Sequence, residues 1–260
     1  MRAAAVNGLD YGQAWRTEQC AADASRGRRG IRLAAVAPEQ VSTQRVTIRP
    51  YEPADLDALY RVCLQTGRNG DDATPLYRDH KLLGHVHAAP YALFEPSLAF
   101  VADDAAGVGG YVIGALDSHD FEARLERDWW PKLRARYPEP PASLPEDQRT
   151  PEQAKAYLIH HPWGTPGELA SRYPSHLHIN LVPRLQSGGH GRRLISTLTD
   201  ALRRRGSRGV HLAVRPTNVR AIGFYRHVGF TELPEAEALF PGTDALVFAM
   251  DLTRPAPREQ

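Results

Sequence analysis

Cysteine is scarce in this sequence: only Cys20 and Cys63 occur among 260 residues. The chain therefore has neither the paired cysteines of a disulfide framework nor a CxxC metal-ligand spacing, and we expect a reducing, cytoplasmic setting. Long hydrophobic runs are missing as well. No stretch approaches the roughly 20 consecutive apolar residues that cross a bilayer, and the N-terminus lacks the apolar core of a secretory signal. We expect no membrane span and no signal peptide.

The sequence also has almost no net charge. The 32 basic and 30 acidic residues leave a net charge of +2, which is too balanced to indicate a nucleic-acid or membrane partner. Six arginines are concentrated within residues 1–35, and a nucleic-acid-binding role rests on this segment alone. Residues 1–44 show no regular apolar periodicity, so we predict a flexible N-terminal arm and expect neither nucleic acid nor membrane as a partner.

Apolar periodicity predicts a single domain over residues 45–252, followed by a tail at 253–260. Its first half contains predicted strands at 45–50, 98–102 and 108–116 and predicted helices at 54–66 and 76–88. Its last third alternates predicted strands at 176–183, 209–215 and 244–252 with predicted helices at 189–205 and 218–228. Residues 118–175 interrupt this pattern with predicted helices at 121–137 and 152–160. Such a long connection indicates a helical insertion that covers a site.

The most distinctive motif is a glycine-rich loop between a predicted strand and a predicted helix. It consists of Gln186, Ser187, Gly188, Gly189, His190 and Gly191. A loop of this kind exposes successive backbone N–H groups at the positive end of a helix, where a pyrophosphate can bind without a cationic side chain. The alternative is a turn that only separates the strand from the helix.

A second motif follows at residues 218–230 and contains Asn218 and Tyr225. The two motifs at this spacing resemble the acetyl-CoA site of the GNAT acyltransferase superfamily, and the resemblance covers about residues 45–252. It implies an α/β (α+β) fold with a central mixed, mostly antiparallel sheet, flanking helices and a helical insertion between the third and fourth strands. It also implies acetyl-CoA as the cosubstrate.

The resemblance assigns roles to residues of both motifs. The fourth strand would separate from the fifth, and the backbone of Leu181 and Val182 would bind the pantetheine arm. The N–H groups of residues 187–191 would hold the pyrophosphate, with the Gln186 side chain closing the loop. Asn218 would contact the pantetheine arm, although its side chain suits the N-cap of the following helix equally well.

The same resemblance makes Tyr225 the acid that protonates the departing thiolate. A phenol stays protonated at neutral pH and can therefore serve as an acid. The alternative is an aromatic side chain packed in the core. The attacking amine must also lose a proton, and our first candidate for the base is Asp117 at the end of the third strand. His178 is the second candidate.

Each candidate base has a structural alternative, because Asp117 suits a helix cap and His178 suits a hydrogen-bonded core position. The other histidines lack an accompanying carboxylate or cysteine at ligand spacing, so no metal site is expected.

A closer resemblance is carried by the segments 207–209, 214–216 and 224–225 together with the strand ending at Asp117. These are similar to the acetyltransferase-like C-terminal domain of O-GlcNAcase and its bacterial relatives. The animal domains of that type lack the phosphate-binding loop and are suspected pseudo-acetyltransferases, whereas this sequence keeps the loop.

We therefore predict an N-acetyltransferase that moves acetyl from acetyl-CoA to an amine by direct attack in a ternary complex. The alternative is a catalytically silent CoA-binding or interaction module. The acceptor would be a small molecule or another amino group, and the insertion could also form a homodimer surface.

Overall fold

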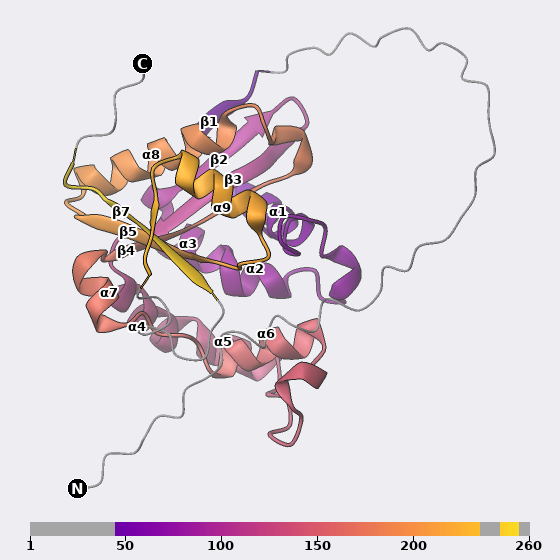
Figure 1. Ribbon diagram of the computed structural model, residues 1–260. Coiled ribbons are helices and arrows are strands. Elements are labelled where there is room, and N and C mark those ends of the chain that lie inside the picture. Colours follow the sequence, from indigo (N-terminus) through magenta and orange to yellow (C-terminus); the bar gives the residue numbers. More distant parts are fainter. Residues whose placement is uncertain (1–44, 235–244, 255–260) are drawn as a thin grey trace, which may run out of the picture.

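The computed structural model describes residues 45–234 and 245–254. The predicted arm at 1–44 and most of the predicted tail lie outside them. The centre of the fold is a seven-stranded sheet in the order β1-β2-β3-β4-β5-β7-β6 (Figure 1). Its strands are β1 (Thr47–Pro50), β2 (Ala99–Asp104), β3 (Gly107–Ala115), β4 (Ser175–Leu181), β5 (Gly209–Val214), β6 (Thr231–Glu232) and β7 (Leu246–Asp251). Only β4 and β5 pair in parallel. The predicted mixed, mostly antiparallel sheet is confirmed.

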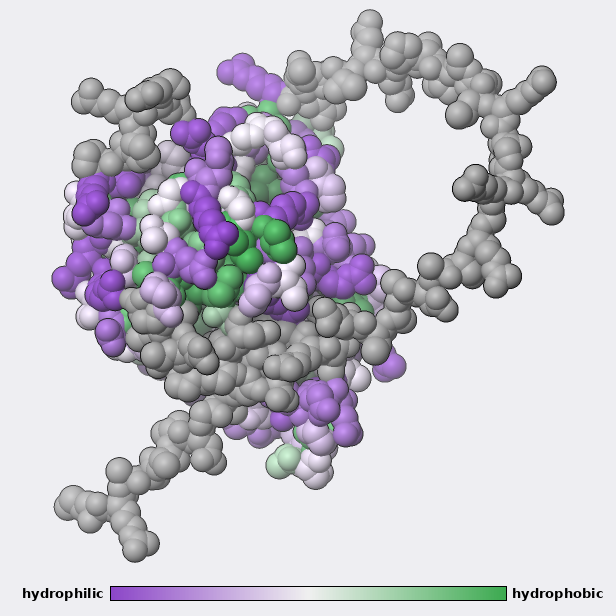
Figure 2. Space-filling view, in the orientation of Figure 1, coloured by the Kyte–Doolittle hydropathy of each residue, from purple (hydrophilic) through white to green (hydrophobic). Residues whose placement is uncertain are grey.

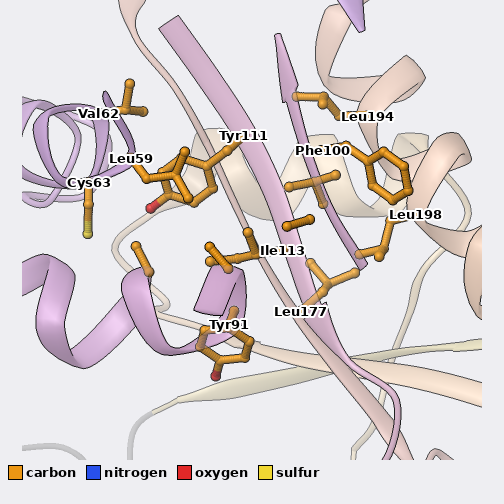
Figure 3. Close-up of a cluster of buried hydrophobic side chains, with 14 of the residues drawn as sticks. Leu59, Val62, Cys63, Tyr91, Phe100, Tyr111, Ile113, Leu177, Leu194 and Leu198 are labelled. Atoms are coloured by element: carbon orange, nitrogen blue, oxygen red, sulfur yellow. The ribbon is translucent and has the colours of Figure 1, made fainter. Parts of the chain in front are cut away.

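Helices cover both faces of the sheet. On one face lies α8 (His190–Arg204), and on the other lie α1 (Leu56–Gln65), α2 (Leu82–His87) and α3 (Ala89–Phe94). Figure 3 shows Leu194 and Leu198 of α8 on the same side as Phe100, whereas Leu59 of α1 lies on the opposite side with Tyr111. Their side chains are almost fully buried. Because side chains alternate along a strand, each strand contributes to both layers of the core.

The insertion between β3 and β4 is helical, as predicted. It contains α4 (Ser118–Asp128), α5 (Trp130–Arg136), α6 (Pro151–His160) and α7 (Gly167–Arg172), which lie below the sheet in Figure 1. The helix predicted at 121–137 is divided at Trp129, because Pro131 has no N–H to continue the helical hydrogen bonds. Contacts of α6 with α2 hold the insertion against the rest of the domain.

The helix predicted at 76–88 begins later than expected, at Leu82. The backbone N–H groups of Arg78 and Asp79 donate to the carboxylate of Glu152 on α6 instead of entering a helix. The sequence pattern also missed the short helices α3 and α7 and the two-residue strand β6. The helix predicted at 218–228 is α9 (Val219–His227). Across the described parts of the chain, no helix has the length and apolar character that a membrane span requires.

Candidate active site

The parallel strands β4 and β5 separate soon after they meet. They pair only at Ser175 with Val210 and at His176 with His211, and then diverge. This separation was expected from the family resemblance. The cavity beside the gap has a volume of about 950 Å³ and is lined by both strands, α9 and the insertion. On the face that carries α9, hydrophobic residues gather at the centre and are surrounded by hydrophilic ones (Figure 2).

The end of β4 offers one backbone N–H to this cavity. The N–H of Val182 donates to the Gly109 carbonyl at 2.9 Å, and the Val182 carbonyl accepts from Leu185 at 2.9 Å. Hydrogen-bonded and non-hydrogen-bonded pairs alternate along an antiparallel ladder, so the N–H of Leu181 points away from β3 and into the gap. The Leu181 carbonyl accepts from Gln186 Nε2 at 2.7 Å. The Val182 N–H is therefore already bonded to β3, whereas the Leu181 N–H faces the gap.

The glycine-rich loop ends at the start of α8 and leaves backbone donors exposed there. Gly189 is the N-cap, with φ +75°, and has no side chain to accept from the first turn. The first bond within the helix runs from Arg193 N–H to the Gly189 carbonyl, so the N–H groups of His190 and Gly191 have no acceptor in the helix. The buried His190 Nδ1 also has no hydrogen-bond partner among the described residues. A pyrophosphate would supply the missing acceptors, and the loop fits the phosphate end of acetyl-CoA.

The loop is fixed to its neighbours on both sides. The Gln186 side chain donates to Leu181 and accepts from Arg220 Nη1 of α9 at 2.6 Å, so it links the start of the loop to β4 and to α9. A Cβ atom on Gly191 would lie 3.0 Å from the ring of Phe224, so a larger residue there would require that ring to shift. Ser187 has a positive φ of 63°. These contacts place the loop beside α9.

Asn218 and Tyr225 of the second motif both line the cavity. The Asn218 side chain accepts from the Ala221 N–H at 3.1 Å, so the structure shows its N-cap role. Tyr225 is buried, with 9% of its surface exposed, and its ring lies against Phe230 and Phe248. Burial raises the pKa of Tyr225 above its usual range, which keeps its hydroxyl protonated at neutral pH.

The two candidate bases, Asp117 and His178, have different surroundings in the structure. Asp117 is not among the residues that line the cavity, and its side chain caps α4 by accepting from the Asp120 N–H at 3.0 Å. Asp117 therefore serves as a helix cap, and our prediction of Asp117 as the base is corrected. His178 does line the cavity. It shares one face of β4 with His176, as the alternation of the strand predicts.

A hydrogen-bonded chain fixes the protonation of His178. Ser118 Oγ donates to the Pro174 carbonyl at 2.8 Å, so it accepts from His176 Nδ1 at 2.7 Å. Burial lowers the pKa of His176 well below its usual range, and this neutral ring accepts from the Tyr91 hydroxyl at Nε2. The Tyr91 oxygen then accepts from His178 Nε2 at 3.1 Å. The lone pair of a neutral His178 therefore resides on Nδ1.

The buried histidines predict acid sensitivity. Burial lowers the pKa of both His85 and His211 from 6.5 to about 4. The unfolded chain takes up their protons first as pH falls, so stability is full above pH 6.5 and is lost toward pH 4. We expect a loss of about 2 kcal/mol per histidine in the free energy of unfolding between pH 7 and 5, measured by urea denaturation. His211→Gln should reduce this pH dependence, and an unchanged slope in that variant would contradict the assignment.

Sequence reasoning missed one carboxylate in the cavity wall. Glu122 of α4 lines the cavity, and its Oε1 accepts from the backbone N–H and the hydroxyl of Thr165 at 2.9 and 2.6 Å. Burial raises the pKa of Glu122. Its only sequence signal is its position between the buried Phe121 and Leu125 on an otherwise polar helix. Within residues 45–234 and 245–254, no group of three or more acidic, histidine or cysteine side chains is placed to hold a metal.

Known proteins show similarity to most of this chain. The chain is 26% identical over 207 residues to protein O-GlcNAcase of Rattus norvegicus, covering 78% of this chain but 22% of that protein. It thus spans about a fifth of the length of that relative. It is also 35% identical over 79 residues to [ribosomal protein bS18]-alanine N-acetyltransferase of Escherichia coli (strain K12), covering 29% of this chain and 53% of that enzyme.

The fold also matches a solved structure. The crystal structure of SsHAT superposes with a TM-score of 0.70 at 36% identity, covering 80% of this chain and 99% of the other. The family model for GNAT acetyltransferases matches residues 95–230, which is more than half of the chain and includes β4, the glycine-rich loop and α9. The chain therefore belongs to the acetyltransferase (GNAT) family.

Proposed function

We propose that this protein transfers the acetyl group of acetyl-CoA to a primary amine by direct attack in a ternary complex. The observation that carries this proposal is a single cavity bordered by the glycine-rich loop, the open edge of β4 and Tyr225 on one side and by the insertion on the other. The first side suits the cofactor. The second side leaves room for an acceptor, so both substrates can be present together.

The donor side is built largely from backbone groups. The N–H groups at the start of α8 would hold the pyrophosphate, and the Leu181 N–H faces the gap where the pantetheine arm would lie. Acetyl-CoA, when bound, supplies an activated acetyl thioester. A fixed N–H that donates to the thioester oxygen stabilises the negative charge developing there, an effect worth several kcal/mol in comparable sites. Leu181 is our candidate for that donor.

Two side chains would move protons. His178 Nδ1 would accept a proton from the amine nitrogen as the new N–C bond forms, and Tyr225 would give its hydroxyl proton to the sulfur as the C–S bond breaks. One proton thus leaves the nitrogen and one reaches the sulfur. The chain through Tyr91 and His176 holds the His178 ring with its lone pair on Nδ1.

A cysteine-linked intermediate is not part of this proposal. Cys63 borders the cavity, but burial raises the pKa of its thiol to about 11. The thiolate is the reactive form of cysteine, so Cys63 is a poor nucleophile at neutral pH. This supports direct attack by the amine.

Removing the Tyr91 hydroxyl should slow turnover through His178. We expect Tyr91→Phe to lower kcat about 10-fold and to move the acidic limb of the pH–rate profile, with little change in the KM for acetyl-CoA. The matched control is Tyr60→Phe, because the Tyr60 hydroxyl also bonds a buried histidine, His85, at 2.8 Å but lies outside the cavity. Equal effects of the two variants on the pH profile would show that Tyr91 has only a structural role.

The proposed function is tested by thiol release. Acetyl-CoA is incubated with the full-length protein and a panel of primary amines, and free CoA is measured with a thiol reagent while mass spectrometry detects the acetylated amine. Amine-dependent release of CoA is the expected result. Calorimetric binding of acetyl-CoA without release by any amine would instead support the silent CoA-binding module.

A further inference from the structure

We propose that the acceptor is a compact primary amine on an apolar or aromatic stem, and that Glu122 binds its ammonium group. This inference rests on the proposed function, because it names the acceptor of the same cavity. It concerns the side of the cavity that the insertion forms, where the sequence motifs assign no residue.

A second cavity, with a volume of about 380 Å³, adjoins the main one at the insertion. The two cavities share the residues Glu122, Leu125, Trp130, Pro162, Trp163 and Gly164. Glu122 therefore lies where the second cavity meets the main one. A molecule that enters through the second cavity reaches the main cavity past this carboxylate.

No lysine or arginine in the described parts of the chain forms an ion pair with the Glu122 carboxylate, and His119 is the nearby titratable group that favours its charged form. Both hydrogen bonds from Thr165 go to Oε1, and Oε2 accepts none from a described residue. One turn later on the same helix, Glu126 is ion-paired with Arg134 at 2.5 Å. Taking a carboxylate out of water without a counter-charge is unfavourable, and a bound cation compensates for that loss. Glu122 is therefore suited to bind a ligand cation.

The charges around the main cavity are divided between its two ends. Among the described residues that line it, Glu122 is the single acidic one, whereas Arg220 contacts the glycine-rich loop at the opposite end. A ligand with an anionic end and a separate cationic partner fits this distribution. The phosphates of acetyl-CoA suit the basic end, and an ammonium suits the acidic end.

The walls near Glu122 exclude strongly polar stems. They are mainly apolar, and the polar residues among them are Thr165, His119 and Glu126. The apolar residues are Phe121, Leu125, Trp130, Leu158, Pro162 and Trp163. An alkyl or aryl stem buries its surface against such walls, whereas the hydroxyl groups of an amino sugar would lose water without gaining partners. A free amino acid would place its own carboxylate beside Glu122. The stem of the acceptor is therefore apolar.

Glu122 also lies close to the proposed proton acceptor. Its charge adds to the burial that raises the pKa of Tyr91, and the neighbouring Phe121 ring stacks on Tyr91 at 4.5 Å. Tyr91 in turn holds His178. An ammonium bound at Glu122 would release one proton to water before attack, and the neutral amine would then lie beside His178, which takes the second proton as the N–C bond forms.

The test measures binding rather than turnover. Benzylamine is titrated calorimetrically into the full-length protein saturated with CoA, with benzyl alcohol as the uncharged isostere and glucosamine as the polar-stem amine. We expect binding of benzylamine and at least 10-fold weaker binding of both comparison ligands. Glu122→Gln keeps an acceptor for Thr165 and should lower the benzylamine affinity at least 10-fold. Asp128→Asn, on the same helix but in the lining of neither cavity, should leave the affinity unchanged.

Several outcomes overturn the proposal. Equal affinity of the wild-type protein for benzylamine and benzyl alcohol, or preference for glucosamine, would do so without any variant. An unchanged affinity in a folded Glu122→Gln variant would do so as well. If that variant does not fold, Glu122→Asp, which withdraws the charge from the cavity, replaces it and should also weaken binding. Benzylamine binding without acetylation of any amine would refute the proposed function and leave the ammonium site standing.

Discussion

Gly189→Glu should abolish acetyl-CoA binding, with a loss of at least 100-fold in affinity, or about 2.7 kcal/mol. The substitution places a carboxylate at the N-cap of α8, where it would accept from the first-turn N–H groups and repel the pyrophosphate. Apart from the adjoining residues of the chain, no described atom lies within 4 Å of a Cβ built at Gly189, so the side chain enters open space and does not disturb the core. Titration calorimetry with acetyl-CoA measures the effect.

The control must separate charge from backbone strain. Gly189 has φ +75°, and a residue with a Cβ pays roughly 1–2 kcal/mol in this region. Asparagine tolerates the left-handed conformation best after glycine, so Gly189→Asn carries a cap without the charge. We expect Gly189→Asn to bind acetyl-CoA more tightly than Gly189→Glu. Unchanged affinity in the glutamate variant would show that the phosphates lie elsewhere.

Tyr225→Phe should lower kcat by about 100-fold or more, as the loss of a general acid typically does, while the affinity for acetyl-CoA stays within about 3-fold. The hydroxyl is the only group removed, and the ring keeps its contacts with Phe230 and Phe248. The melting temperature should therefore change little. Steady-state kinetics at saturating amine measure the effect.

The matched control for this substitution is the neighbouring aromatic residue. Phe224→Leu disturbs the contact with Gly191 and should weaken acetyl-CoA binding more than it lowers kcat. A Tyr225→Phe variant with wild-type kcat would show that another group, or water, protonates the leaving sulfur.

The donor side of the site was largely predictable from the sequence because it depends on local backbone geometry. A strand, a glycine-rich loop and a helix must follow one another within a short segment, and the spacing of Gln186, Gly189 and Gly191 records that requirement. The same segment does not reveal whether the backbone N–H of Leu181 or that of Val182 faces the gap between β4 and β5. That choice depends on the register of β4 against β3, which a single strand does not encode.

The acceptor side was not predictable in the same way. Asp117 stands at the end of a strand and has the right chemistry for a base, but a carboxylate there caps the next helix equally well. Glu122 is one acidic residue on a polar helix until tertiary packing turns it toward the cavity. The chain of Ser118, His176, Tyr91 and His178 joins residues up to 87 positions apart in the sequence. No local pattern could reveal that contact.

The predicted boundaries of two helices were also wrong. Pro131 divides the helix predicted at 121–137, although apolar periodicity continues through this position. The late start of α2 has a different cause. Glu152 binds the preceding backbone from 73 positions away, so only the assembled insertion reveals it.

The short pairing of β4 with β5 has a consequence for how the domain holds together. One part of the sheet consists of β1 to β4 and the other of β5, β7 and β6. Two β4–β5 residue pairs connect them, together with a contact between the Ser175 and Ser207 hydroxyls at 2.7 Å. A ligand held by Leu181 on one part and α9 on the other would act as a cross-link between them. Part of its binding energy would then become folding energy of the C-terminal third, whose amide hydrogens would exchange more slowly in the complex.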